Sequence, residues 1–363
     1  MDERKALIGL SIAGVQAYQP MQALMNYFGS FCEVFQSEGA HIEKALGRSQ
    51  STACAVLKAS KNFSELLERI HEVENQFTVL TCRDLEYPER LLQIYDPPWV
   101  LYAKGEPDFS KPMLAMVGAR RATSYGKWAA EKFAGEVSQY GIGIISGLAY
   151  GIDAASHGGC IDKLGYTVGV LGGGIDGVYP SGNRHLFKQL EDKGCIISEY
   201  PPGITPQKHF FPARNRIISG LSHGVFVVEA GEKSGALITA DFAMEQGRDV
   251  FALPGNINHR MSTGTNRLLR DGARMVLETE DLVEPLGINA ALDRKVNTEL
   301  TDRLPDLTEK EKRVYQVIQS EPTHPEKIVI QLQYSIAEIN GILTVLELKG
   351  LVRQLPGKTF TVC

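Results

Sequence analysis

The sequence of 363 residues lacks the features that mark several large classes of protein. No run of about 18 apolar residues is present, so we expect no membrane-spanning helix. The first residues, MDERKALIGLSIAG, carry charges of both signs and no small-residue cleavage site, which does not indicate a signal peptide. The 6 cysteines are scattered, without a CxxC or Cys/His cluster. This pattern argues against a disulfide framework or a zinc site and predicts reduced thiols in a cytoplasmic protein.

An excess of charge of one sign is also missing. Lys and Arg total 38 and Asp and Glu total 43, for a net charge of −5. This balance excludes a strongly basic coat for nucleic acid, although a local basic groove remains compatible with it. Hydrophobic residues make up 43% of the chain and charged residues 22%, which predicts folded domains and excludes global disorder.

Motifs for catalysis and cofactor binding are absent. The order of residues contains no Ser/His/Asp or Cys/His pattern, no metal-ligand spacing and no Walker A loop. Gly172–Gly177 fits GxGxxG, but Pro180 prevents a helix from beginning there, which argues against a dinucleotide-binding oxidoreductase. His157 follows Asp153 by four residues without a third ligand, so we interpret it as a structural hydrogen-bonding residue. We therefore predict no catalytic residues, no metal and no cofactor.

What is present divides the chain into three domains and a linker. Residues 1–75 show short helical patterns, and residues 76–285 alternate apolar runs with amphipathic stretches. Residues 286–305 have weak periodicity and predict a linker. Residues 306–363 predict three helices and a strand hairpin, the winged-helix pattern.

The middle segment predicts an α/β fold with a doubly wound, mostly parallel sheet. Near-continuous apolar strands separated by helices are typical of a sheet that is covered on both faces. In such sheets ligands bind beyond the carboxyl ends of the strands, where this sequence has polar or Gly-rich turns. The predicted strands are 113–118, 142–146, 167–171, 195–198, 224–229, 249–255 and 273–277.

Two of these turns predict anion-binding positions. Gly118 lets the backbone bend after its strand, and Arg120 offers a bidentate fork for phosphate near the start of a helix. An ordinary surface arginine is the alternative interpretation. In the next turn Ser146 offers a hydroxyl, and Gly147 lets a ligand approach the main chain.

The densest basic and aromatic cluster is KHFFPARNR, at 208–216. Lys208, Arg214 and Arg216 are candidates for contacts to backbone phosphates, while Phe210 or Phe211 offers a face on which a base stacks. Alternatively, both phenylalanines belong to the core and the two arginines solvate the start of a helix.

A further turn carries Ser234, Gly235 and Thr239 directly before and within a predicted helix. These residues are suited to capping the helix or to binding an anion at its start, and the sequence does not separate the two roles.

Together, the turns resemble those of the DNA-processing protein A family (DprA, also called Smf). The matching segments, in order, are VGARRATSYG, SGLAYGIDAASH, LGGGIDGVYPSGNRHL, SEYPPG, FFPARNRIISGLS, VVEAGEKSGALITADFAMEQGRDVFALPG and STGTNRLLRDGA. Each segment alone is a weak signal, but seven in one order are specific. The flanking segments look like the sterile-alpha-motif-like helical domain and the winged helix of longer members.

The resemblance implies an extended Rossmann-like domain that binds single-stranded DNA without catalysis. Family members dimerise and deliver the DNA to the RecA recombinase, past single-stranded-DNA-binding protein, in natural transformation. The motif matches assign a phosphate-binding role to Arg120 and DNA contacts to Lys208, Phe211 and the Arg214-Asn215-Arg216 run.

The resemblance also predicts a homodimer around Leu268 and Leu269, unless both leucines pack under the sheet of a monomer. A rival interpretation is an enzyme similar to the nucleoside-monophosphate phosphoribohydrolases, which have a related layout. Their Pro-Gly-Gly-x-Gly-Thr-x-x-Glu turn is missing at 229–235, where the sequence reads EAGEKSG.

The predicted recognition helix of the winged-helix segment, at 335–349, is poor in base-reading side chains. It carries Glu338 and Glu347 against Lys349, and only Asn340 is suited to a base edge. We therefore expect no sequence-specific binding of duplex DNA there.

Overall fold

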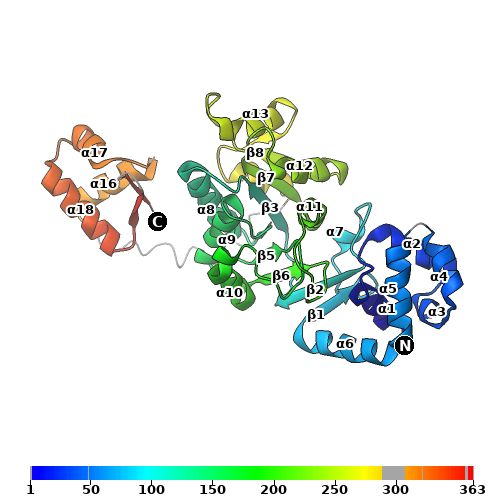
Figure 1. Cartoon of the computed structure of the whole chain (residues 1–363). Helices are drawn as coiled ribbons and strands as arrows, with labels where there is room; N and C mark the ends of the chain where they lie inside the picture. The colour runs from blue at the N-terminus through cyan, green and yellow to red at the C-terminus, as the bar shows by residue number, and fades with distance from the viewer. Residues whose placement is uncertain (1, 48, 288–306, 321, 356–358, 363) are drawn as a thin grey trace. The chain divides into compact units, whose positions relative to one another are not determined.

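The computed structural model describes residues 2–47, 49–287, 307–320, 322–355 and 359–362. The chain forms two compact units, Met1–Asp293 and Arg294–Cys363 (Figure 1). The predicted linker, 286–305, lies almost wholly outside the described residues.

The first unit is built on a nine-stranded sheet in the order β1-β2-β6-β5-β4-β3-β7-β8-β9. The strands are β1 (Thr78–Thr81), β2 (Val100–Gly105), β3 (Met113–Gly118), β4 (Gly143–Ser146), β5 (Thr167–Val170), β6 (Cys195–Ser198), β7 (Gly224–Glu229), β8 (Asp249–Ala252) and β9 (Arg274–Met275). From β6 to β9 every pairing is parallel, which confirms the predicted mostly parallel sheet. The sequence did not predict that β2 would pair antiparallel with β6, or that β1 would pair antiparallel with β2 at the edge of the sheet.

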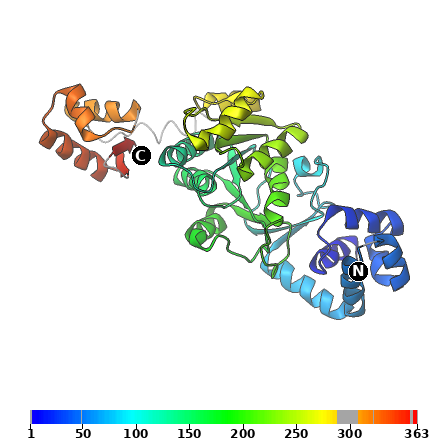
Figure 2. The ribbon, with the colours of Figure 1, turned by 45° about the horizontal axis from the view of Figure 1, so that its top comes forward.

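Helices cover both faces of the sheet, because the strand residues that point to each of the two faces are apolar. On β3, Leu114 and Met116 pack with α8 (Ser124–Ser138) and α9 (Ile152–Asp162). Ala115 and Val117 belong to the opposite core with α11 (Phe210–Leu221), α12 (Gly235–Glu245) and α13 (Thr263–Arg270). Two further helices, α10 (Arg184–Lys193) and α7 (Glu89–Leu92), pack against α9 and α11, respectively (Figure 2). Shorter elements are η1 (Ser181–Asn183), η2 (Arg260–Ser262), α14 (Glu280–Val283) and η3 (Glu284–Leu286).

The N-terminal helices share a hydrophobic core with the β1–β2 end of the sheet. This core combines their leucines and phenylalanines with Tyr102 of β2 and Leu190 of α10. The buried Tyr102 hydroxyl donates a 2.9 Å hydrogen bond to Ser11 Oγ on α1. The helices are α1 (Glu3–Ile12), α2 (Tyr18–Phe28), α3 (Phe31–Gln36), α4 (Gly39–Leu46), α5 (Gln50–Lys61) and α6 (Phe63–Gln76).

The second unit has the predicted winged-helix pattern. Its elements are α16 (Glu309–Ser320), α17 (Pro325–Leu332), α18 (Ile336–Leu348) and the antiparallel hairpin β10 (Val352–Leu355) and β11 (Thr359–Val362). In α18, which corresponds to the predicted 335–349 helix, Glu338 accepts a hydrogen bond from Lys310 Nζ at 2.5 Å. In the described part of the chain no single helix is long and apolar enough to cross a membrane; α17 and α18 meet those criteria only as a pair bent by 116°.

Candidate functional site

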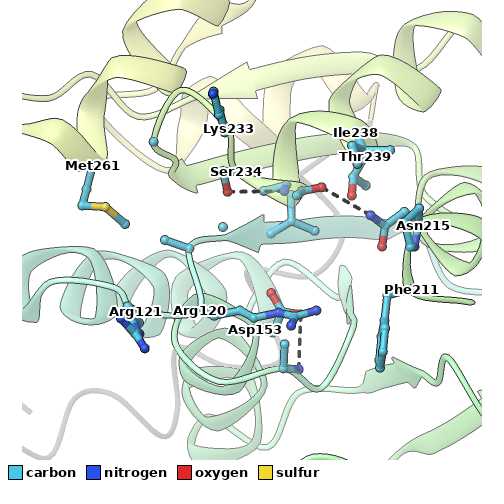
Figure 3. A pocket seen from close by; sticks show the side chains of 18 of the residues that line it. Arg120, Arg121, Asp153, Phe211, Asn215, Lys233, Ser234, Ile238, Thr239 and Met261 are labelled. Atoms are coloured by element: carbon cyan, nitrogen blue, oxygen red, sulfur yellow. Dashed lines mark hydrogen bonds between the residues drawn. The ribbon is translucent and has the colours of Figure 1, made fainter. Parts of the chain in front are cut away.

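A cavity of about 1160 Å³ lies beyond the carboxyl ends of β3 and β7. The strand order reverses between these two neighbours, because β4, β5 and β6 follow on one side and β8 and β9 on the other. This switch point is where doubly wound sheets bind ligands. The turn after β3, the start of α11 and the loop after β7 line the cavity, together with residues near η2 (Figure 3).

The turn that carries Arg120 is held by a buried carboxylate from the neighbouring strand. Glu229, the last residue of β7, accepts hydrogen bonds from the Thr123 N–H at 2.8 Å and the Thr123 hydroxyl at 2.7 Å. Gly118 is required at the bend, because a Cβ there would lie 2.5 Å from Ile152 Cγ1. The turn is therefore fixed, and the side chain of Arg120 is exposed on it at the edge of the cavity.

Phe211 lies at the centre of an aromatic and cationic group. The Arg120 guanidinium carbon is 5.3 Å from the centroid of the Phe211 ring, within the range of a cation–π contact. On α11 the ring is partly exposed, and its centroid lies 5.4 Å from that of Tyr179. By contrast, Phe210 stacks on Tyr200 at 4.1 Å and does not line the cavity. Of the two phenylalanines that the sequence left as alternatives for base stacking, Phe211 is thus the one that lines the cavity.

The cavity attracts anions because its exposed cations are not neutralised. These cations form no ion pair with an acidic side chain in the part of the chain that the structure describes; they are Arg120, Arg121, Lys208, Lys233 and Arg260. Of the two acidic residues in the lining, Glu232 is exposed and Asp153 is buried. A polyanion that enters here meets a surplus of positive charge.

Arg214 forms part of the lining from a buried position. Its side chain donates to the Val170 carbonyl, and its Nε has no hydrogen-bond partner among the described residues. Burial lowers the pKa of Arg214 to about 10, while Asp153 acts in the opposite direction. A Cβ on Gly147 would lie 2.2 Å from Arg214 Nη1, so glycine is required for this packing. Asp153 Oδ2 accepts hydrogen bonds from the N–H groups of Gly147 at 3.2 Å and Ala149 at 3.3 Å, and burial raises its pKa.

Ser234, Gly235, Thr239 and Asn215 also line the cavity. Ser234 caps α12, because its hydroxyl accepts a 3.4 Å hydrogen bond from the Ala236 N–H. The Asn215 side chain donates to the Gly235 carbonyl at 3.4 Å and joins α11 to this helix start (Figure 3). Ser234 therefore caps α12 at the end of the helix that faces the cavity, which is also the end that an anion would approach.

Three predicted site residues do not line this cavity. Ser146 is buried, and its hydroxyl donates to the Met116 carbonyl at 2.6 Å. Gly147 lies against Arg214. Arg216 is 5% exposed, and its guanidinium is bound to Glu199 at 2.6 Å. Because these polar groups already have internal partners, we leave all three out of the direct contacts proposed below.

Sequence reasoning missed several lining residues, among them Tyr179, Lys233, Arg260 and Met261. Tyr179 and Lys233 belong to quoted motifs in the loops that follow β5 and β7, and this membership was an available signal. Arg260 and Met261 belong to none of the seven matching segments, and the packing of η2 beside the loop after β7 brings them to the cavity.

His157 has the predicted structural role. It is fully buried on α9, and its Nδ1 lies 2.7 Å from Thr167 Oγ1, which itself donates to the Ile144 carbonyl. The hydroxyl therefore accepts from the ring, which fixes the tautomer. Burial, aided by Arg214, lowers the pKa of His157 from 6.5 to about 3. No group of three or more potential metal ligands occurs within the described residues.

This depressed pKa predicts a loss of stability in mild acid. Below pH 6.5 the unfolded chain binds a proton at His157 that the folded chain does not, so the free energy of unfolding falls from pH 6.5 toward 3. Between about pH 7.5 and 5.5 we expect His157 to contribute a loss of about 1.4 kcal/mol, measured by urea unfolding. His157→Asn should remove that contribution, whereas the exposed control His185→Asn should retain it. An unchanged pH dependence in His157→Asn would contradict the assignment.

The fold and the cavity define a class: a doubly wound, Rossmann-like protein with an anion-attracting, aromatic-lined cleft and a C-terminal winged helix. Residues 78–287 match the family model of DNA recombination-mediator protein A, and residues 298–358 match that of the DprA winged helix domain. The chain belongs to the DNA recombination-mediator protein A family, which confirms the resemblance drawn from its motifs.

Relatives and solved structures agree with this membership. The chain is 36% identical to Protein Smf of Synechocystis over 352 residues, covering 88% of this chain and 86% of the relative. It is 41% identical to DprA of Bacillus subtilis over 243 residues, covering 66% and 82%. The X-ray structure of Streptococcus pneumoniae DprA matches with a TM-score of 0.68 and 34% identity, covering 78% of this chain and 98% of that one. A Helicobacter pylori DprA structure, described for its single-stranded DNA binding mode, matches with a TM-score of 0.53 and 31% identity, covering 58% and 96%.

Proposed function

We propose that this protein binds single-stranded DNA in the cavity at the β3–β7 switch point, without catalysis. The observation that carries the proposal is the partly exposed Phe211 ring beside the unneutralised cations Arg120 and Lys208. Cations that track phosphates, next to an aromatic face for an unpaired base, hold single strands without reading their sequence. Duplex DNA hides the base faces, so it cannot use Phe211 in this way.

The wider role that we propose is that of a recombination mediator. The protein protects single-stranded DNA in the cytoplasm and loads the RecA recombinase onto it, past single-stranded-DNA-binding protein, during natural transformation. Membership of the family supports this role, as does the H. pylori relative whose structure concerns single-stranded DNA binding.

The decisive experiment compares fluorescence anisotropy of labelled single-stranded and duplex DNA of the same length. We expect tighter binding to the single strand. Release of free base from nucleoside monophosphates is assayed in parallel, because the rival enzyme class would produce it. Release of base together with no single-strand preference would replace the proposed function by the phosphoribohydrolase one.

Arg120→Ala should weaken binding to all single strands alike and reduce its salt dependence. One lost phosphate contact makes the negative slope of log Kobs against log[salt] shallower by about 0.7 for single strands. Affinities measured over a series of salt concentrations give this slope. Arg69→Ala is the matched control, because Arg69 lies on α6 and does not line the cavity. A slope that does not change in Arg120→Ala would exclude the phosphate contact.

We also propose that the protein is a homodimer through the β9 end of the sheet. Of the two predicted interface residues, Leu268 is 9% exposed in the core of its own chain, and the partly buried Leu269 packs on the same core. The exposed apolar side chains at this end are instead Met275 and Leu277. Light scattering at micromolar concentration should give twice the chain mass, and Met275→Asp should shift the protein toward monomer. A wild-type monomer would contradict the dimer.

A further inference from the structure

Two strongly exposed tyrosines lie beside the cavity on adjacent loops. Tyr150, in the turn after β4, is 48% exposed, and Tyr179, in the loop after β5, is 50% exposed. Neither residue belongs to the contacts proposed above. Exposed aromatic side chains that gather beside a binding cavity offer faces on which bases stack.

The two loops are fastened to each other. The Asn183 side-chain amide donates hydrogen bonds to the carbonyls of Leu148 at 2.9 Å and Ala149 at 3.2 Å. The hydroxyl end of the Tyr150 side chain lies against Gly182, because a Cβ at Gly182 would meet the tyrosine hydroxyl at 2.7 Å and a ring carbon at 3.2 Å. The two tyrosines are therefore carried on one joined surface.

This surface is continuous with the cavity. Tyr179 itself lines the cavity, and its ring centroid is 5.4 Å from that of Phe211 at an angle of 39° between the planes. The Phe211 ring contacts both Tyr179 and the Arg120 guanidinium, so the aromatic surface extends from Phe211 to Tyr179. A strand that leaves Phe211 in this direction meets Tyr179 next.

A cation for the phosphate backbone lies close by in the chain. Arg184, the first residue of α10, follows Asn183 directly and is exposed. It forms no ion pair to an acidic side chain among the residues that the structure describes. The surface thus repeats the combination found at Phe211, an aromatic face beside an unneutralised cation.

We propose that Tyr179 and Tyr150 form a second base-stacking subsite, which continues the path of the DNA single strand beyond Phe211 while Arg184 contacts its backbone. This inference rests on the proposed function, because it extends the same binding site. The tyrosine subsite lengthens the strand that one chain holds, and it is insensitive to sequence because every base has a π-face.

The test measures the affinity of oligothymidylates from about 4 to 16 nucleotides, the range of site sizes known for single-strand binders. Tyr150→Leu and Tyr179→Leu should each weaken binding of the longer strands about fivefold or more. Strands that are short enough to fill only the Phe211 position should bind Tyr150→Leu with nearly the affinity that they have for the wild type. Tyr150→Phe and Tyr179→Phe keep the ring and should bind as the wild type does. Tyr95→Ala is the control, since Tyr95 is 87% exposed and lines neither this surface nor the cavity.

A strand with abasic positions separates stacking from other effects. When the bases opposite the tyrosines are removed, wild type and leucine variants should bind equally. A loss that persists on the abasic strand, or leucine variants that match Tyr95→Ala on every strand, would overturn the tyrosine subsite while leaving the proposed function intact. If the wild type binds no single strand, the proposed function itself fails. Tryptophan emission verifies that each variant is folded. If Tyr179→Leu does not fold, the test is made with Tyr150→Leu alone.

Discussion

Replacing Arg216 by methionine should lower the free energy of unfolding of the first unit by about 3–5 kcal/mol. This is the usual cost of removing one partner of a buried ion pair. The expected effect is large because Glu199 would be left as an uncompensated buried carboxylate. The Arg216 and Glu199 side chains are 6% and 7% exposed and joined at 2.6 Å. Burial raises the pKa of Glu199, and Arg216 opposes that rise.

Arg216 also connects three parts of the chain. Its Nε lies 3.0 Å from Asp96 Oδ2 and donates to the Asp96 carbonyl at 3.1 Å, and its Nη1 donates to the Ala213 carbonyl at 3.0 Å. Methionine fills a similar volume but donates none of these hydrogen bonds, so the loss is electrostatic rather than a cavity effect.

Urea unfolding followed by tryptophan fluorescence measures this loss cleanly, because the chain has 2 tryptophans, Trp99 and Trp128, and both lie in the first unit. The double variant Arg216→Met/Glu199→Gln should regain part of the stability, since no buried charge remains unpaired. Arg121→Ala, an exposed arginine of the cavity, should change stability by less than about 0.5 kcal/mol. A mild effect of Arg216→Met, combined with a large loss of DNA affinity, would return Arg216 to the DNA contacts.

Phe211→Ala should weaken binding to single-stranded DNA by about 1–3 kcal/mol, the usual contribution of one stacked base. Its ring is partly exposed in the cavity, so its removal takes away the stacking face without emptying a core position. Duplex DNA should lose much less affinity, because its bases are already stacked on one another. Anisotropy titrations with matched strands measure both.

The neighbouring phenylalanine provides the control. Phe210 stacks on Tyr200 and does not line the cavity, so Phe210→Ala should reduce stability but leave single-strand affinity nearly unchanged in the folded protein. A double-mutant cycle with Arg120→Ala should show coupling, because Arg120 lies over the Phe211 ring. Equal losses on single-stranded and duplex DNA would exclude the stacking role of Phe211.

Much of the fold and part of the site could be predicted from the sequence. Near-continuous apolar runs predicted seven strands, and the structure contains a strand within each of them. In a parallel sheet the carboxyl ends of all strands meet at one edge, so the turn with Arg120 and the loop with Ser234 were expected at that edge. They are neighbours because β3 pairs with β7, which the sequence did not show. Lys208 and Phe211 follow another strand end, and they reach the same cavity.

The role of each side chain within a motif was decided only by tertiary packing. Arg214 and Arg216 are two residues apart on α11, and a helix with about 3.6 residues per turn directs them to different sides. One side faces the cavity, where Arg214 lies, and the other meets Glu199 and Asp96, which hold Arg216. The sequence shows two equivalent arginines beside one asparagine. It cannot show which one is neutralised, because the neutralising carboxylates come from segments that are distant along the chain and are brought there by the packing of the helix against the sheet.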